Sequence, residues 1–546
     1  MKLSGWKLAV SVLAALILAG EIYGPAMAGV FVLDDLYLPF AHANASTMPV
    51  GAWLAGQRPV LMLSYWINYG MSGVNPSAYH WTNVLLHVVN AGFVFAILRR
   101  LTRNELISAL AAGIFLVHPI QTEAVAYVAG RSDVLSALFS LAAYLMFLRI
   151  REAGATWAGI APVAVLFVCA VLCKEQAAVL PGALLLTDFW LGGIAAVRVN
   201  ARLHGLFVVL GAAGGAFVAW RLSLADTAGL GLAGLGPMDY FFTQCRVVWH
   251  YLKLVVLPLG LNIDTDFAIS RSLFDQGSII GLVAILALIA GAWRIRPKHP
   301  LVGLGLLLFL LWLVPTSSFM PIRDVVAERR VYLPLAGLLL AAAGYLARSA
   351  VSKEVLLAGG GVAMLVLSVL TYGRAEAWGD DIKLWEETVR ESPRKWRPRF
   401  QLADAYFQSR RFAEANREFA KAAEIDGSDV RLLVNWGLSL DAAGDTNGAL
   451  VKFEQAVKRE SPAHTQSLVG MANGKLGRYD EALKALDAGG KLDPNFAPIY
   501  VNRGNVYASH GNWVEAVPQY KTALRLDPNN EGARHGLRQG LQNGVQ

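Results

Sequence analysis

Residues 355–393 read VLLAGGGVAMLVLSVLTYGRAEAWGDDIKLWEETVRESP, and the character of the chain changes within this stretch. The first half is almost wholly apolar, as a membrane-spanning helix requires. The second half carries charges at short intervals. Before this stretch, apolar runs follow one another from Met1 to about Tyr372, whereas after about Arg374 no run could span a bilayer. The sequence therefore predicts a polytopic membrane domain followed by a water-soluble domain.

The composition agrees with a membrane protein. Of the 546 residues, 55% are hydrophobic and only 16% are charged, whereas about 25% of a soluble globular chain is charged. In a membrane protein the net charge of +8 is mainly an orientation signal, because Lys and Arg collect in cytoplasmic loops. No basic stripe with interleaved aromatic residues indicates a nucleic-acid partner. The three cysteines do not form a disulfide framework, since two of them lie in one apolar run.

Eleven apolar cores could cross a membrane if they borrow flanking residues. They are Leu8–Ala28, Val84–Leu98, Leu106–Val117, Val134–Leu148, Trp157–Cys173, Ala177–Trp190, Leu206–Trp220, Ile279–Trp293, Leu301–Val314, Val331–Leu346 and Val355–Leu370. The basic clusters, beginning with Lys2 and Lys7, all fall on one side if the N-terminus is cytoplasmic. This topology places the C-terminal domain outside the cytoplasm. We expect an uncleaved first span; the alternative is a signal peptide cleaved after Ala26-Met27-Ala28.

One further apolar segment, Phe241–Leu257, is predicted to lie on the membrane surface. Asp239, Thr243, Arg246, His250 and Lys253 recur at helical spacing and give this segment a polar stripe. A twelfth span here would also move the basic residues after the eighth span to the wrong side. The alternative is a span whose polar stripe faces a cavity.

The C-terminal region repeats itself with a period near 34 residues. The near-copies KLDPN (491–495) and RLDPN (525–529) are the clearest pair, and small and aromatic residues keep fixed offsets in four units. This pattern resembles tetratricopeptide repeats, which stack helix pairs into an α-solenoid. We divide the chain into a membrane domain (1–373), a connecting helix or half-repeat (374–395) and about four repeats (396–546). The candidate acceptor-binding residues on the concave face are Asn435, Trp436, Asn502, Arg503 and Asn505; repeat packing or solvation explains each of them equally well.

With this topology the loops that carry unusual polar residues all face outward. Charges near hydrocarbon are costly, so they usually pair or serve a site. Arg131 and Asp133 could pair across a turn, and Lys174 and Glu175 could form a local ion pair. In the functional alternative, outward cations meet a phosphate at the headgroup level. The candidate donor-binding residues are Arg58, His118, Glu123, Arg131, Asp133, Lys174, Glu175, Arg329 and Arg330, with Arg221 also on this side.

The adjacent acids Asp34 and Asp35 lie just after the first span, on the same side. A carboxylate can take the proton of an acceptor hydroxyl while cations stabilise a departing phosphate. Direct displacement with one base would invert the anomeric carbon of a sugar. No P-loop, HExxH or GxSxG signature supports a competing reaction class. Asp34 and Asp35 could hold a divalent cation, but no second carboxylate cluster follows them at motif spacing, so no metal site is assigned.

The order of motifs resembles a known family. FVLDD, HPIQTEAVAYVAGRSDVLSALF, LCKEQ and ERRVYLPLAG, followed by the repeats, are similar to the transmembrane and tetratricopeptide-repeat-containing O-mannosyltransferases. The resemblance implies a C-type glycosyltransferase membrane fold, a polyprenyl-phosphate-linked sugar donor, and transfer to Ser or Thr of an acceptor protein. It also implies that Asp34 and Asp35 hold the catalytic position, with Asp34 preferred. Few repeats and Ala- and Gly-rich spans suggest a bacterial relative in an inner membrane, with the repeats in the periplasm.

Two other classes of function compete with a glycosyltransferase. A non-catalytic membrane scaffold would use the repeats to recruit proteins, and its outward polar loops would be scattered in space. A transporter would need a polar path through the whole bilayer, whereas the unusual polar residues here favour one face.

Overall fold

The computed structural model describes residues 5–224 and 235–545, and these residues form helices joined by loops. Lys2 lies outside the described residues, as do the side chains of Lys7 and Arg221. The chain divides into two compact units, Met1–Leu384 and Trp385–Gln546. The division falls within α16 (Asp381–Glu391), inside the predicted connecting segment.

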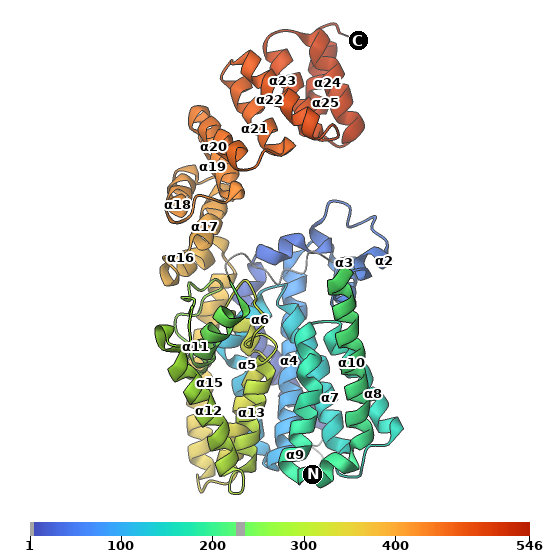
Figure 1. Cartoon of the computed structure of the whole chain (residues 1–546), viewed down its shortest axis with the longest axis vertical. Helices are drawn as coiled ribbons and strands as arrows, with labels where there is room; N and C mark the ends of the chain where they lie inside the picture. Colours follow the sequence, from blue (N-terminus) through green and yellow to red (C-terminus); the bar gives the residue numbers. More distant parts are fainter. Residues whose placement is uncertain (1–4, 225–234, 546) are drawn as a thin grey trace. The chain divides into compact units, whose positions relative to one another are not determined.

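The first unit is a bundle of helices whose axes run roughly along one direction (Figure 1). Its α-helices are α1 (Gly5–Tyr23), α2 (Val50–Leu54), α3 (Pro59–Ser72), α4 (Pro76–Thr102), α5 (Glu105–Val117), α6 (Thr122–Ala126), α7 (Arg131–Ile150), α8 (Trp157–Val171), α9 (Leu180–Val199), α10 (Ala201–Leu224), α11 (Pro237–Val256), α12 (Ser278–Ile295), α13 (Pro300–Leu313), α14 (Pro334–Leu346) and α15 (Lys353–Trp378). Short 3₁₀ turns join them: η1 (Gly24–Ala28), η2 (Leu33–Tyr37), η3 (Pro39–Ala41), η4 (Pro119–Gln121), η5 (Glu175–Val179), η6 (Asp275–Gly277) and η7 (Glu328–Val331).

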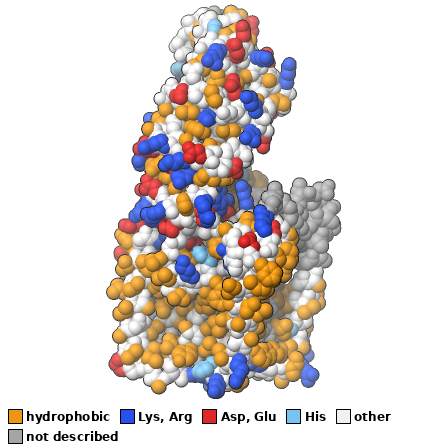
Figure 2. Space-filling model, turned by 60° about the vertical axis from the view of Figure 1, so that its left-hand side comes forward, with side chains coloured by type: hydrophobic (Ala, Val, Ile, Leu, Met, Phe, Trp, Pro, Cys, Tyr) orange, Lys and Arg blue, Asp and Glu red, His pale blue; other side chains and the backbone are white. Residues whose placement is uncertain are grey.

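Apolar length identifies the first unit as a membrane domain. Among the described residues, six helices are long and apolar enough to cross a membrane, or seven if the bent pair α5 and η4–α6 counts as one span. Four shorter apolar helices, α8, α10, α13 and α14, accompany them. Each of the eleven predicted cores overlaps one of these helices, while the number of crossings stays a prediction. On the face shown in Figure 2, hydrophobic side chains form a broad band over the bundle.

Helix boundaries follow local signals in the sequence. Proline occupies the first turn of α3, α4, α9, α11, α13 and α14, where its missing N–H costs no hydrogen bond. Asn75 caps α4 and Asn104 caps α5, each accepting a backbone N–H with its side-chain oxygen. These signals fix where the helices end and therefore where the loops of the bundle begin.

Helix α11 differs from the apolar helices around it. It is not among the helices apolar enough to cross a membrane. Its predicted polar stripe is partly covered, because Thr243 is buried and Arg246 donates to the Ala268 carbonyl oxygen and the Ser270 hydroxyl. The polar face of α11 therefore packs under the segment after it, which the sequence pattern did not indicate.

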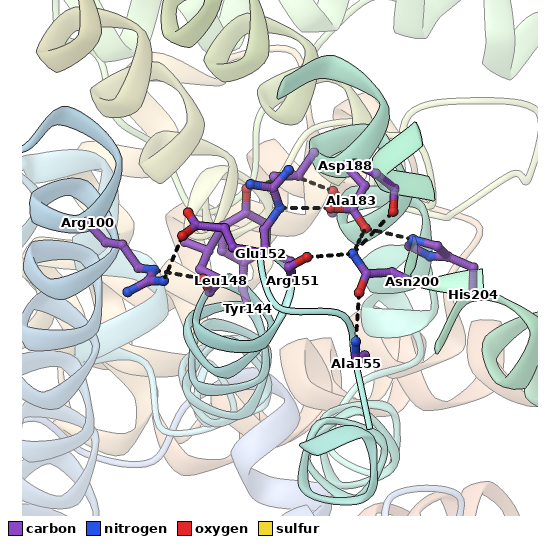
Figure 3. A network of polar contacts seen from close by, with 12 residues as sticks. Arg100, Tyr144, Leu148, Arg151, Glu152, Ala155, Ala183, Asp188, Asn200 and His204 are labelled. Atoms are coloured by element: carbon purple, nitrogen blue, oxygen red, sulfur yellow. Dashed lines mark hydrogen bonds and ion pairs between the residues drawn. The ribbon is translucent and has the colours of Figure 1, made fainter. Parts of the chain in front are cut away.

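One end of the bundle carries η2, η4, α6 and η7, and we call it the η2 end. The other end, where α9 is labelled in Figure 1, is called the opposite end. At that opposite end Asp188 is fully buried and accepts hydrogen bonds from Arg151 Nε (2.8 Å), Asn200 Nδ2 (2.9 Å) and His204 Nε2 (2.9 Å) (Figure 3). Asn200 also accepts the N–H of Ala155. This network fixes the loops at the opposite end.

The Asp188→Leu variant should be strongly destabilised, because the substitution leaves the Arg151 guanidinium and its neighbours without a counter-charge. Breaking a buried ion pair in this way costs about 3–5 kcal/mol. Thermal unfolding in detergent measures the loss, and hydrogen exchange in residues 30–38 at the η2 end should stay at the parent level. An unchanged unfolding temperature would show that the network contributes little.

The second unit is a solenoid of helix pairs. After α16 come α17 (Trp396–Gln408), α18 (Phe412–Ile425), α19 (Val430–Ala442), α20 (Thr446–Arg459), α21 (Ala463–Lys475), α22 (Tyr479–Leu492), α23 (Ala497–Ser509), α24 (Trp513–Leu526) and α25 (Glu531–Gln542). Small residues let the paired helices approach each other: Gly437 faces the Phe453 ring, and Gly504 faces the Tyr520 ring. The repeat pattern therefore corresponds to four helix pairs and a final helix.

Candidate functional site

The η2 turn presents one of its two acids and buries the other. Asp34 is exposed, whereas Asp35 is completely buried. Asp35 accepts the N–H of Val32 at 3.1 Å and the N–H of Ala129 at 2.7 Å. The residue before the pair, Leu33, has a φ of +47°, a strained conformation for a bulky side chain. The two hydrogen bonds of Asp35 therefore hold the turn in this unusual backbone conformation.

The buried acid has a structural role. Burial raises the pKa of Asp35 to about 8, although the two backbone N–H groups lower it. The resemblance placed both acids at the catalytic position, whereas in the structure Asp35 binds the backbone of its own turn and of the loop 127–129. Asp34 is the acid whose carboxylate is open to a substrate.

The loop 118–133 packs against the η2 turn and is bonded to it through Tyr127 and Ala129. His118 is buried, accepts the Ile120 N–H through Nδ1 and bonds the Val255 carbonyl through Nε2. Arg131 is completely buried beneath Tyr65, with its guanidinium carbon 4.5 Å from the ring centre. Its donors reach Asn83, Asn68 and the carbonyls of Ser64 and Tyr79. Arg131 is therefore not available to a phosphate, contrary to the sequence-based expectation, because its guanidinium holds this loop to α3 and α4.

The remaining charges pair differently from the local pairs considered from sequence. Arg131 does not pair with Asp133. Instead, Lys174 Nζ donates hydrogen bonds of 2.6 Å to both carboxylate oxygens of Asp133. Lys174 and Glu175 do not pair with each other, because Glu175 binds Arg58 at 2.8 and 2.9 Å. Sequence spacing suggested ion pairs between residues close in sequence, whereas the packing of the helices brings together partners that are far apart in sequence.

A third ion pair between distant segments joins Glu123 to Arg329. The Glu123 carboxylate is fully buried and accepts both the backbone N–H and the guanidinium of Arg329. Arg329 is partly exposed. This pair therefore ties loop 118–133 to η7 across 206 residues of sequence.

A polar cavity at the η2 end brings three of the predicted cations together. Lys174, Arg329 and Arg330 line it, with Asp133 as the carboxylate in its wall. Arg330 donates to the carbonyls of Asp324 and Val325. Counting Glu123 behind Arg329, three cations face two carboxylates, which leaves one net positive charge. Such a site suits a singly charged anion such as a phosphodiester.

An apolar cavity adjoins the polar one and shares Ser140, Trp312 and Leu333 with it. Helices α4, α7, α13 and α14 supply its remaining wall, which is lined by Val94, Ile97, Leu98, Leu141, Tyr144, Leu308, Ala336, Gly337 and Leu340. The two cavities together offer charge at one end and hydrocarbon at the other. This arrangement matches an amphipathic ligand with an anionic head and an apolar chain.

Polar residues of α4 form a buried stripe between helices. His80 bonds the Ala126 carbonyl, Asn83 bonds the Tyr127 carbonyl, and His87 bonds the Tyr332 hydroxyl. Tyr127 itself was missed from sequence. Its hydroxyl accepts the N–H of Asp34, and nothing in the sequence around a single loop tyrosine signals that contact.

The five candidate acceptor residues all have partners within the repeats. Asn435 donates to Asp404, and Asn502 donates to Ser467, so both link adjacent repeats. Trp436 lies under Lys452, Arg503 pairs with Asp487, and Asn505 accepts the Tyr520 hydroxyl. Repeat packing, the alternative given from sequence, accounts for these contacts, and an acceptor role stays a prediction.

The fold and the site define the class: an integral membrane protein with an all-helical membrane domain and a tetratricopeptide-repeat solenoid. The tetratricopeptide repeat family matches residues 497–530 and 475–511. Solved structures of repeat proteins also match, among them YrrB, described as a TPR protein with an unusual peptide-binding site. That match has 22% identity and a TM-score of 0.26, and covers 29% of this chain and 81% of YrrB. MamA matches with 22% identity and a TM-score of 0.24, covering 26% of this chain and 84% of MamA.

The chain is homologous over most of its length to proteins named protein O-mannosyl-transferase of the TMTC family. Human TMTC3 is 24% identical over 559 residues, which cover 88% of this chain and 58% of the relative. A protein O-mannosyl-transferase of Caenorhabditis elegans is 26% identical over 386 residues, covering 68% and 54% of the two chains. The resemblance predicted from the motifs is confirmed. The chain spans little more than half of the length of these curated relatives.

Proposed function

We propose that this protein is an inverting protein O-glycosyltransferase that uses a polyprenyl-phosphate-linked sugar and acts on the extracytoplasmic side. Two observations carry the proposal. The polar cavity at the η2 end shares three lining residues with an apolar cavity, and the exposed Asp34 is held by Tyr127 of the loop that also binds Arg329. The naming of the relatives as protein O-mannosyl-transferases supports the reaction class.

The donor would place its phosphodiester among Lys174, Arg329 and Arg330 and its isoprenoid chain in the apolar cavity. A phosphodiester carries one negative charge, which balances the net positive charge of the site. When the sugar leaves, the lipid phosphate gains a second negative charge. Cations fixed at the developing charge stabilise the transition state more than the ground state.

The reaction would be a single displacement. The Ser or Thr oxygen of the acceptor attacks the anomeric carbon, the bond from that carbon to the phosphate oxygen breaks, and the Asp34 carboxylate takes the hydroxyl proton. The phosphate leaves with the electron pair of the broken bond. One base and one displacement invert the configuration at the anomeric carbon. The repeats would bind the acceptor protein, in keeping with the usual role of such solenoids.

The scaffold alternative is less well supported. It predicts polar loops scattered in space, whereas the Asp34 N–H lies 2.9 Å from the Tyr127 hydroxyl oxygen, and the Tyr127 ring centre lies 5.9 Å from the Arg329 guanidinium carbon. The transporter alternative needs a polar path through the bilayer, but the cavity that adjoins the polar one is lined mainly by apolar side chains.

A transfer assay separates these classes. Purified protein in lipid nanodiscs would receive polyprenyl-phosphate sugars with labelled mannose, glucose or N-acetylglucosamine, together with Ser- and Thr-containing acceptor proteins. Label on the acceptor supports the proposal. Folded protein that binds acceptors through its repeats but transfers none of these sugars would support a scaffold.

Donor binding should weaken as pH rises through about 8. Burial lowers the pKa of Lys174 to about 8, although Asp133 raises it, so this cation is charged below that pH and neutral above it. A phosphodiester keeps one charge throughout, and the loss therefore belongs to the protein. Binding of a fluorescent polyprenyl-phosphate sugar would be measured between pH 6.5 and 9.5. The Lys174→Arg variant should hold its affinity across this range, because guanidinium stays charged. Equal affinity of the parent at both ends of the range would contradict the assignment.

A further inference from the structure

Tyr127 contacts both the η2 turn and Arg329, one of the cations that line the polar cavity. Its side chain is almost completely buried, and its hydroxyl oxygen accepts the N–H of Asp34 at 2.9 Å. Its ring lies next to Arg329, whose guanidinium carbon is 5.9 Å from the ring centre. The ring also lies beside Trp378, with ring centres 5.7 Å apart. One side chain therefore contacts both the segment of the candidate base and a candidate donor cation.

The backbone that this residue holds would not adopt its conformation unaided. Leu33 has a left-handed φ of +47° directly before Asp34. Such strain persists only where the surrounding structure over-determines it. Here the Asp35 carboxylate accepts the N–H of Val32, just before the turn, and the N–H of Ala129 in the neighbouring loop. The Tyr127 hydroxyl accepts the N–H of Asp34 itself. Of these groups, only the Tyr127 hydroxyl acts directly on the residue that presents the base.

We propose that Tyr127 is a positioning residue that sets Asp34 at a fixed distance from Arg329, and so sets the base relative to the leaving phosphate. This inference rests on the proposed glycosyl transfer and adds a residue to it. The hydroxyl fixes the base through the backbone of Asp34, while the ring limits where the Arg329 guanidinium can lie. A displacement of about 1 Å between reacting groups can cost about 100-fold in rate.

The Tyr127→Phe variant isolates the hydroxyl, because the phenyl ring keeps the contacts with Arg329 and Trp378. The expected result is a fall in kcat of about 10- to 100-fold with KM for the donor within about twofold of the parent. Hydrogen exchange in residues 30–38 should become faster, since the Asp34 N–H loses its acceptor. The Tyr127→Leu variant also removes the ring and should raise KM for the donor.

Tyr65→Phe is the matched control. The Tyr65 hydroxyl is buried beside the same loop and donates its hydrogen bond to the Val128 carbonyl at 2.9 Å, not to the backbone of the η2 turn. We expect Tyr65→Phe to lower the unfolding temperature about as much as Tyr127→Phe while leaving exchange in residues 30–38 close to the parent. Equal falls in kcat for the two variants would overturn the proposal, because they would indicate general loosening of the loop.

The measurements distinguish a failure of the positioning role of Tyr127 from a failure of the proposed function. If the parent protein transfers sugar and Tyr127→Phe keeps the parent kcat, the positioning role is wrong and the proposed function stands. If the parent transfers no sugar, the proposed function fails; exchange in residues 30–38 then still tests the contact, and parent-like exchange in Tyr127→Phe overturns it.

Discussion

Replacing Asp34 with Asn is expected to lower kcat by about 10²- to 10⁴-fold, the usual contribution of a general base. The amide keeps the size and polarity of the side chain but cannot take a proton from the acceptor hydroxyl. The Asp34 side chain is exposed, and the contact that fixes the turn uses its backbone N–H. The unfolding temperature and donor affinity should therefore stay at the parent values, and initial transfer rates at saturating donor give the comparison.

Asp35→Asn is the control that separates chemistry from structure. Its carboxylate accepts two backbone N–H groups in a buried position, and an amide in the same place has one oxygen to offer instead of two. We expect Asp35→Asn to lower the unfolding temperature and speed hydrogen exchange in residues 30–38, effects that Asp34→Asn should lack. If Asp35→Asn abolishes transfer in a stable protein while Asp34→Asn transfers at the parent rate, the two roles are reversed.

Replacing Arg329 with Met should cause a large loss of stability. The Glu123 carboxylate is fully buried and would lose the guanidinium that neutralises it. Removing one partner of a buried ion pair costs about 3–5 kcal/mol. Transfer should also fall below detection, because the donor phosphate loses a cation. Unfolding by denaturant and the transfer assay would be run on the same preparation.

A second substitution distinguishes the two consequences. Glu123→Gln combined with Arg329→Met removes the unpaired charge and keeps an oxygen for the Arg329 backbone N–H, which position 329 retains as Met. The double variant should recover most of the stability and none of the transfer. Recovery of both would show that Arg329 serves folding alone and does not contact the donor.

Much of the architecture could be predicted from sequence because its signals are local. Apolar length marks the helices of the membrane domain, and the period near 34 marks the repeats. The site was predictable only in outline. The described loops that were predicted to face outward do meet at one end of the bundle, but which charge pairs with which depends on helix packing. Lys174 therefore binds Asp133 rather than the adjacent Glu175, and Arg131 is buried as a structural residue.

Tyr127 shows the other limit of sequence reasoning. Its role depends on a hydrogen bond across 93 residues to a strained turn, and neither the strain at Leu33 nor the bond leaves a pattern in the sequence. The acceptor residues predicted in the repeats show the reverse. Asn435 and Asn502 occupy corresponding positions and suggested a binding face, yet each of them donates a hydrogen bond to the preceding repeat, at Asp404 and at Ser467.

The configuration of the product tests the central claim most directly. Purified protein would transfer sugar labelled with ¹³C at the anomeric carbon from the polyprenyl-phosphate donor, and nuclear magnetic resonance of the glycopeptide would give its anomeric configuration. We predict a product of the opposite configuration to the donor, formed by the parent protein and not by the Asp34→Asn variant. A product that keeps the donor configuration, or that forms equally well without the Asp34 carboxylate, would contradict single displacement with Asp34 as the base.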